Sequence, residues 1–500
     1  MNQPTLALIA TRKRFINYCS YQVETLVGGG GSKLCTLKFQ FSFLLIKTLL
    51  KSSNLKAYKE VKPLLKTPYI PLKILLLQNL SFVSQHFDEV NLWLNSKEFK
   101  DKYERENHPY PPLLDPDKLN DENYILNYEK IPAEKAWEMN LPLPKNYKFA
   151  FFIYGSSAHE AMMDFFQASF NLIFHPVTDG LNEINPQDFY STEFKDVATF
   201  TRWYWIYKKF DEKGVYLSAD LPFIILVRDP IGRIKHRANH GGIKRGKSHN
   251  TSFHLNDNID EVLDRKRFYQ QSPYPTLGAI PSLIKQSQLV NFSYTSTAKI
   301  CNKEVYYIDA SEVNPDKVMD SMRKYAKFFG KDLDEERLKG LEEFLKQKKM
   351  TELRYIIPLT LKIRSLNLEI CLKGRKGNLK DYAKELVDKD LENLKVFDII
   401  ALAMSEEDFK ALKEDEKLFN ETKIYLNEFV KKLDNLRQKY VETYVKEKDV
   451  LEYLKTYKYE ALTLKKVLDK EFTHIKENRP DIVASWKYYG EFEKNCKELN

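Results

Sequence analysis

Basic side chains are concentrated directly after one apolar segment of the chain, 221–227. A predicted helix follows this segment, and the residues of interest there are Arg228, Asp229, Arg233, Lys235, His236, Arg237 and His240. Guanidinium groups and the N–H groups at a helix N-terminus bind phosphate through charge-assisted hydrogen bonds, so Arg228 and Arg233 predict an anion site. Asp229 would orient an arginine or cap the helix. The alternative is a structural ion pair between Arg228 and Asp229, followed by a basic surface helix.

A second candidate is the turn formed by Gly155, Ser156 and Ser157, which follows the apolar run 148–154. A loop between a strand and its helix can cradle a phosphate with backbone N–H groups. This loop lacks the Lys and the second Gly of a complete P-loop. His159 and Glu160 follow in the first helical turn, as a general base and its orienting partner or as a pair facing solvent. His236 is the third candidate for proton transfer.

The segment 241–248 (GGIKRGKS) fits the P-loop expression letter for letter. A P-loop connects a strand to a helix, whereas this segment follows the basic helix and leads into turn-forming residues. We therefore interpret it as a basic loop that covers a substrate, with a P-loop nucleotide hydrolase as the weakest alternative. No metal is predicted: His236 and His240 are four residues apart but surrounded by cations.

The elements that must position these residues alternate between strand and helix. Continuous apolar runs at 148–154, 221–227 and 304–309 predict strands of a parallel sheet covered on both faces. Helical sequence follows each run, at 158–168 after the first and from Pro315 after the third. This alternation predicts an α/β fold with a three-layer, mostly parallel sheet, in which ligands bind at the carboxyl ends of the strands.

The chain has 500 residues, more than one ordinary domain. We predict four regions, which are a basic helical N-terminal region with a Gly tract (1–104), an α/β core (105–350), a small α/β appendage (351–410) and a helical C-terminal region (411–500). In the last region an apolar stripe repeats every three or four residues and predicts packing against a neighbouring helix. Its members are Leu426, Phe429, Leu433, Leu436 and Tyr440.

Positive charge is concentrated in residues 1–80, which hold twelve Lys or Arg against two Glu, while the whole chain carries +9. This segment predicts peripheral contact with an anionic membrane surface or, equally, a solvated basic face on packed helices. No recognised nucleic-acid module accompanies the charge. Five scattered Cys and the lack of a signal peptide or of an apolar run of about 20 residues indicate a cytoplasmic location.

The segment PFIILVRDPIGRIKH resembles the 3′-phosphate element of carbohydrate sulfotransferases, and VYYIDASEV with the helix after it resembles a later part of that P-loop-type fold. The resemblance implies that Arg228 grips a donor phosphate, that Arg233 supports it, and that residues 155–157 form the other phosphate loop. His236 stands where that family has a Ser, and the loop lacks its Lys. A nucleotide-activated donor is therefore implied, either PAPS-like or a nucleotide sugar, with the donated group left open.

Four phrases within 105–495 resemble an epsilonproteobacterial family of unknown function, namely YPPLLDP, KAWEMNLPLPKNYKF, LVRDPIGRIKHRANH and PDIVASWKYYGEFEK. Members of that family lie in capsule and surface-glycan loci, often behind G tracts, which implies that Gly28–Gly31 is a phase-variable tract. We expect a transferase that moves a sugar, sulfo or phospho-type group to a surface polysaccharide or its lipid-linked precursor. The main alternative is a non-catalytic accessory protein that kept the fold, which the incomplete phosphate loop favours.

Overall fold

The computed structural model describes most of the chain after residue 53, in the ranges 41–42, 44–45, 54–178, 185–192, 197–202, 212–243, 251–264, 266–268, 272–285, 289–331, 333, 336, 339–340, 353 and 356–499. It divides into two compact units. The first comprises 1–152, 173–224 and 299–306, and the second comprises 153–172, 225–298 and 307–500. The glycine tract lies outside the described residues, as does more than half of the basic segment 1–80 for which membrane contact is predicted.

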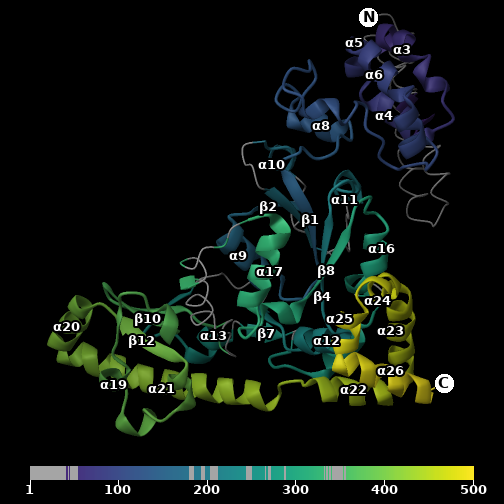
Figure 1. Ribbon diagram of the computed structural model, residues 1–500. Helices are drawn as coiled ribbons and strands as arrows, with labels where there is room; N and C mark the ends of the chain where they lie inside the picture. Colours follow the sequence, from purple (N-terminus) through teal and green to yellow (C-terminus); the bar gives the residue numbers. More distant parts are fainter. Residues whose placement is uncertain are drawn as a thin grey trace, which may run out of the picture. The chain divides into compact units, whose positions relative to one another are not determined.

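The central sheet has five strands in the order β2-β3-β1-β4-β8 (Figure 1). Their bounds are Tyr147–Ile153 for β1, Ile173–Thr178 for β2, Val197–Arg202 for β3, Phe223–Val227 for β4 and Val305–Asp309 for β8. β2 and β3 pair in parallel. Every residue of β4 is buried, because a continuous apolar run offers side chains to both faces of the sheet. The predicted α/β class is thereby confirmed.

Three helices of the second unit follow these strands, as the sequence predicts. They are α9 (His159–Phe170) after β1, α12 (Pro230–Ala238) after β4 and α17 (Val318–Phe329) after β8. Phe166 of α9 meets the rings of Tyr325 and Phe329 of α17 at centroid distances of 5.5 Å each. α17 begins at Val318, after a turn in which the N–H groups of Lys317 and Val318 both donate to the Asn314 carbonyl oxygen at 2.9 Å, so Pro315 opens that turn and not the helix itself.

The first unit is mainly helical outside its part of the sheet. Its helices include α3 (Leu55–Val61), α4 (Ile70–Gln78), α5 (Leu80–Gln85), α6 (Phe87–Leu94), α8 (Ala133–Glu138), α10 (Pro186–Phe189) and α11 (Glu212–Leu217). Trp93 on α6 packs edge-on against Phe99 and Tyr103 and donates its indole N–H to the Pro112 carbonyl oxygen at 3.0 Å. The proline-rich stretch after residue 108 is therefore tied to the helices before it.

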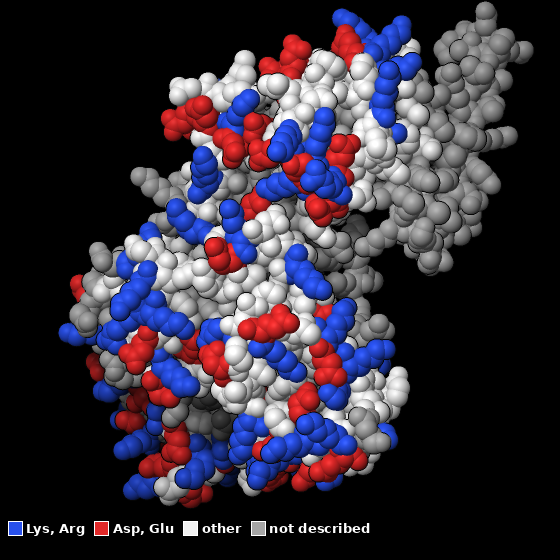
Figure 2. All heavy atoms as spheres, turned by 45° about the vertical axis from the view of Figure 1, so that its right-hand side comes forward, with Lys and Arg blue, Asp and Glu red and all other residues white. Residues whose placement is uncertain are grey.

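The second unit ends in a group of helices, α22 (Glu447–Thr456), α23 (Lys458–Glu471), α24 (Thr473–Asn478), α25 (Pro480–Ser485) and α26 (Lys487–Leu499). α22 and α26 pack against α12. Lys and Arg side chains are interspersed with Asp and Glu on the face drawn in Figure 2. Among the described residues, none of the helices is both long and apolar enough to cross a bilayer.

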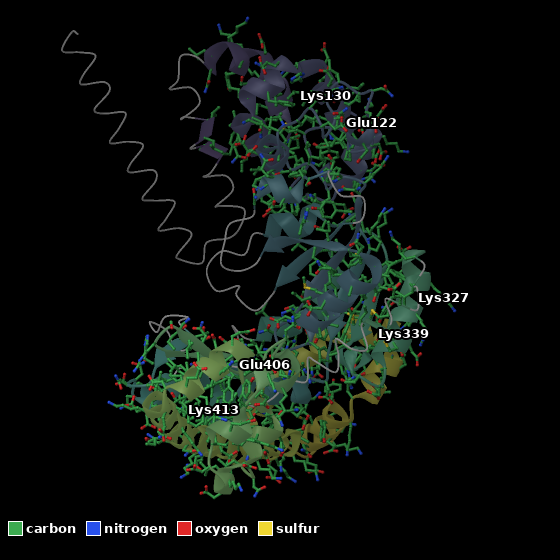
Figure 3. All side chains as sticks on the ribbon, turned by 90° about the vertical axis from the view of Figure 1, so that its left-hand side faces the viewer. Glu122, Lys130, Lys327, Lys339, Glu406 and Lys413 are labelled. Carbon is green, nitrogen blue, oxygen red and sulfur yellow. The ribbon has the colours of Figure 1, made fainter. Side chains whose placement is uncertain are left out.

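The second unit also holds another sheet, in the order β11-β12-β10-β9-β6. Its strands are β6 (Ser252–His254), β9 (Leu359–Ile363), β10 (Leu366–Leu372), β11 (Lys380–Asp381) and β12 (Ile400–Met404). The long helix α21 (Glu416–Glu442) buries Leu426, Phe429 and Leu433 in the same apolar cluster as these strands, so the predicted stripe packs on a sheet and not only on a helix. Figure 3 labels Glu406 and Lys413 on α20 (Glu406–Glu414), which precedes α21.

Acid should weaken the first unit through His108. Burial lowers the pKa of this histidine from 6.5 to about 4, where Tyr103 and Tyr216 pack edge-on against its ring. Because the folded pKa lies below the unfolded one, the stabilisation is complete above pH 6.5 and is lost as the pH falls towards 4. The loss amounts to at most about 3 kcal/mol.

His108→Asn keeps an acceptor for the Tyr110 N–H and removes the titration. Urea unfolding at neutral and acidic pH should therefore show a weaker acid loss in this variant. His254→Asn, at a side chain 69% exposed, serves as the control and should change nothing. If the stability of His108→Asn falls at acidic pH as much as that of the natural protein, His108 does not cause the loss.

Candidate functional site

The loop between β1 and α9 has an unusual backbone. Ser156 and Ala158 both adopt positive φ angles, 67° and 62°, although neither is glycine. Alternation of left- and right-handed residues turns successive N–H groups towards one point, which is the geometry of an anion-binding nest. Ala158 is the N-cap of α9, and no side-chain hydrogen bond caps that helix. The loop therefore suits a bound anion.

Arg228 connects this loop to the neighbouring strand. It follows β4 directly, and its Nη1 donates to the Ser156 carbonyl oxygen at 2.9 Å. Because one residue follows β4 and the other follows β1, the carboxyl ends of these two strands meet here, at the edge where ligands of α/β sheets bind. Burial lowers the pKa of Arg228, while Asp309, Glu447 and Asp229 oppose that shift. Partial burial leaves the guanidinium charged and reachable.

The carboxylates near Arg228 have hydrogen-bond partners of their own. Asp229 accepts from the backbone N–H groups of Ile231 and Gly232 through Oδ1, and from those of Tyr488 and Tyr489 through Oδ2. One carboxylate thus caps α12 and α26 together. No ion pair between Arg228 and Asp229 is among the described contacts, and Asp229 acts as the predicted helix cap.

Asp309 and Glu447 also have partners other than Arg228. Asp309 ends β8 and accepts from the Trp486 indole N–H at 2.7 Å. Glu447 pairs with Lys235 of α12 at 3.0 Å, with both side chains mostly buried. These contacts do not remove the negative charges, so Asp309 and Glu447 favour the charged form of Arg228 although neither is among the described ion pairs of that residue.

Arg233 lies deeper than Arg228 and contacts protein on all sides. Its residue is only 4% exposed, and the guanidinium donates to the backbone and side-chain oxygens of Asn291. It also lies over the Phe292 ring at 4.8 Å and near the Tyr154 ring. Burial lowers the pKa of Arg233 to about 10, so it stays protonated at neutral pH.

Asn291 joins Arg233 to the loop. Its Oδ1 accepts from the Gly155 N–H at 3.3 Å as well as from Arg233 Nη2 at 3.2 Å. The loop is held a second time from within, because Ser157 is fully buried and donates its hydroxyl to the Tyr154 carbonyl oxygen. Arg233 therefore acts as a positioning residue for the loop, whereas Arg228 is placed to contact a ligand.

The three residues predicted for proton transfer lie on two different helices, His159 and Glu160 on α9 and His236 on α12. His159 is the first residue of α9 and its Nε2 is buried, next to the loop in sequence. Glu160 is exposed. His236 is half-buried on α12, with its ring 6.4 Å from that of His240. Among the described residues, no cluster of three or more His, Cys, Asp or Glu side chains is arranged to hold a metal ion.

The segment that fits the P-loop expression begins in a strand. Gly241–Ile243 form β5, which pairs antiparallel with β7 (Lys266–Phe268). Residues 244–250 lie outside the described residues, and the chain after them continues as strand β6. The described segments on both sides, Gly241–Ile243 and Ser252–His254, are strands, whereas a P-loop leads from a strand into a helix.

Relief of the left-handed backbone in the loop gives a direct test of its geometry. Ala158→Gly should stabilise the protein by about 1 kcal/mol, because a Cβ is unfavourable at positive φ. Ala161→Gly within α9 should instead destabilise it by up to about 1 kcal/mol. Thermal unfolding of the two variants separates these effects. If Ala158→Gly lowers the unfolding midpoint like Ala161→Gly, Ala158 is not left-handed.

Comparison with known proteins gives one match. Residues 307–499 match the model of a family described as "Protein of unknown function (DUF2972)". The matched region begins at the carboxyl half of β8 and includes Asp309, Glu447, Trp486 and the N-terminus of α26. No curated protein and no solved structure matches the chain significantly. The match therefore covers the helices that buttress the site and supplies no chemistry.

Proposed function

We propose that the chain is a transferase that moves an activated group from a nucleotide-type donor to a capsular or other surface polysaccharide. The single observation that carries this proposal is the contact between Arg228 and the Ser156 carbonyl oxygen, which joins two phosphate-binding features at the ends of adjacent strands. A cation, a nest of N–H groups and the N-terminus of a twelve-residue helix converge there.

The chemistry suited to this arrangement is displacement at an activated group with a phosphate as leaving group. The loop N–H groups and Arg228 would hold the donor phosphates and stabilise the charge that grows on them. His159, Glu160 or His236 would accept the proton of the acceptor hydroxyl. Such catalysis consists mainly of positioning and charge stabilisation, which agrees with a site where Arg233 and Asn291 fix the loop.

A sulfotransferase-like arrangement of the core is part of this proposal. Two segments support it. Residues 147–170 run from a strand through a loop into a helix, and residues 223–238 run from a strand through Arg228 into a helix. We also propose that the protein works in the cytoplasm, where nucleotide donors are made, and that its acceptor is a polysaccharide or lipid-linked glycan. Peripheral membrane contact through residues 1–80 would bring it to a lipid-linked acceptor.

Calorimetric titration with a donor panel tests the proposal. The panel contains adenosine 3′,5′-bisphosphate, UDP, CMP and their activated forms, with adenosine as the uncharged control. We expect one nucleotide class to bind saturably and inorganic pyrophosphate to compete with it. Absence of binding across the panel would overturn the proposal.

A second candidate is an accessory protein of glycan assembly without catalysis. The observation in its favour is that Arg233 and the Gly155 N–H both donate hydrogen bonds to Asn291 and are therefore engaged within the protein. A protein of this kind would bind glycan but no nucleotide, so the same titrations, repeated with oligosaccharides, separate the two functions.

A further inference from the structure

A groove in the second unit lies outside the residues that form the proposed donor site. One wall consists of α14 (Ile280–Leu283) and the residues after it, and the other is a face of α23. That face presents Tyr459, Thr463, Lys466 and Lys470, which are spaced by three or four residues. The groove has a volume of about 1350 Å³. Small-molecule pockets have about 300–1,000 Å³, so this groove suits an extended chain.

The groove combines an apolar floor with an exposed aromatic ring. Ile284 and Leu289 line it and are 3% and 2% exposed. Tyr459 lines it too and is 79% exposed, more than any other large hydrophobic or aromatic residue described as exposed. An aromatic ring left in water beside a groove provides a flat face on which the C–H groups of a pyranose ring can stack.

The charged residues that line the groove are four lysines against Glu460, Asp469 and Glu471, so their charges sum to +1 and give a small excess that favours an anion. Asp469 pairs with Lys465 at 2.7 Å. Glu471 accepts from the backbone N–H and hydroxyl of Ser296 and pairs with Lys470 at 3.4 Å. These two carboxylates are therefore neutralised within the protein.

The remaining charged groups in the lining are Lys285, Lys466 and Glu460. Both lysines are exposed, and no carboxylate among the described residues lies within ion-pair distance of either. Two ammonium groups on opposite walls, Lys285 on one and Lys466 on the other, can each bind a negatively charged substituent of a chain lying between them.

One segment connects the groove to the donor site. Leu289 lines the groove, and Asn291, two residues later in the same segment, holds both the Gly155 N–H and Arg233. The segment 289–291 thus contributes both to the lining of the groove and to the support of the phosphate loop. This connection fits an acceptor better than an unrelated ligand.

We propose that this groove binds an acidic oligosaccharide, with Tyr459 stacking on a sugar ring and Lys285 and Lys466 binding its carboxylate or phosphate groups. The proposal rests on the proposed function, since it makes this glycan the acceptor of the transfer. Nucleic acid would use a series of stacked bases along a basic track, whereas the groove offers one exposed ring.

Titration of the full chain with short oligogalacturonates tests the proposal, with neutral maltooligosaccharides of equal length for comparison. We expect the acidic saccharide to bind and the neutral one to bind more weakly. Tyr459→Ala should lower the affinity about tenfold and Tyr459→Phe should retain it, because the ring and not the hydroxyl stacks. Lys466→Ala should lower it by a similar factor, and Lys413→Ala, at an exposed lysine on α20, should leave it unchanged.

Outcomes for the groove and for the donor site can be told apart. Tyr459→Ala should bind nucleotide donors normally, and Arg228→Ala should bind oligogalacturonate normally. If neither saccharide binds while a donor does, or if Tyr459→Ala binds the acidic saccharide as well as the natural protein, the groove proposal fails and the donor site stands. Tighter binding of a single-stranded oligonucleotide or a polyglutamate peptide in the groove would also overturn it. Saccharide binding without any donor binding would contradict the transferase and, with it, the role of this glycan as acceptor, but not the groove as its binding site.

Discussion

Arg228→Ala is expected to lower the affinity for the nucleotide donor by at least about 30-fold, because truncation of one partner in a desolvated charge pair costs about 2–5 kcal/mol. Arg228 contributes its positive charge and also donates to the Ser156 carbonyl oxygen. The variant therefore loses both the cation that would contact the donor and one hydrogen bond that holds the loop. Calorimetry with the donor class identified by the panel measures the change. Circular dichroism and the unfolding midpoint show whether the fold is kept.

Two further variants isolate the role of the guanidinium. Arg228→Lys keeps the positive charge but not the planar fork of donors, so its affinity should fall between those of the natural protein and Arg228→Ala. Arg323→Ala removes a half-exposed arginine from α17 and should bind donors normally. Normal donor binding by Arg228→Ala would remove this residue from the site.

Asp229→Asn is expected to destabilise the second unit by about 3 kcal/mol, because an amide nitrogen replaces an oxygen that accepts two backbone N–H groups. Burial raises the pKa of Asp229, while the four N–H groups favour its charged form and oppose that shift. After the substitution the side-chain amide NH₂ group points at the two backbone N–H groups of one helix, either α12 or α26, and two donors then face each other. The midpoint of thermal unfolding should fall accordingly.

Asp229→Ser tells the two helices apart. A serine hydroxyl can still cap α12 but cannot also reach the N–H groups of Tyr488 and Tyr489. Amide hydrogen exchange should then speed up in α26 and stay slow in α12. Equal protection of α26 in the natural protein and in Asp229→Ser would show that Asp229 does not anchor that helix.

A large part of the site follows from local sequence. A run of apolar residues long enough for a buried strand, followed by Arg-Asp-Pro, predicts both β4 and the start of α12, since Pro at the first turn and Asp before it are standard helix-start residues. The sequence predicts the loop 155–157 in the same way, from its place between a strand and a helix. Periodicity and capping depend on residues close in the chain, so they can be read without a structure.

Other parts of the site depend on residues that are distant in sequence. Asn291 lies 58 residues after Arg233 and 136 after Gly155, in a short 3₁₀ turn with no motif. The contacts of Trp486, Tyr488 and Tyr489 with Asp309 and Asp229 span between 177 and 260 residues. Polar residues of this kind show no periodicity, and nothing in their neighbours indicates which distant backbone they meet.

The α/β class and the candidate anion site at Arg228 and the 155–157 loop can be predicted from the amino-acid sequence, because local patterns set strands, helix starts and the residues at their ends. Three features are visible only in the folded protein: Arg233 is buried as a support, β6 pairs in parallel with β9, and one carboxylate caps two helices. These features arise from packing between distant segments, and packing selects partners by shape and unsatisfied hydrogen bonds rather than by spacing along the chain.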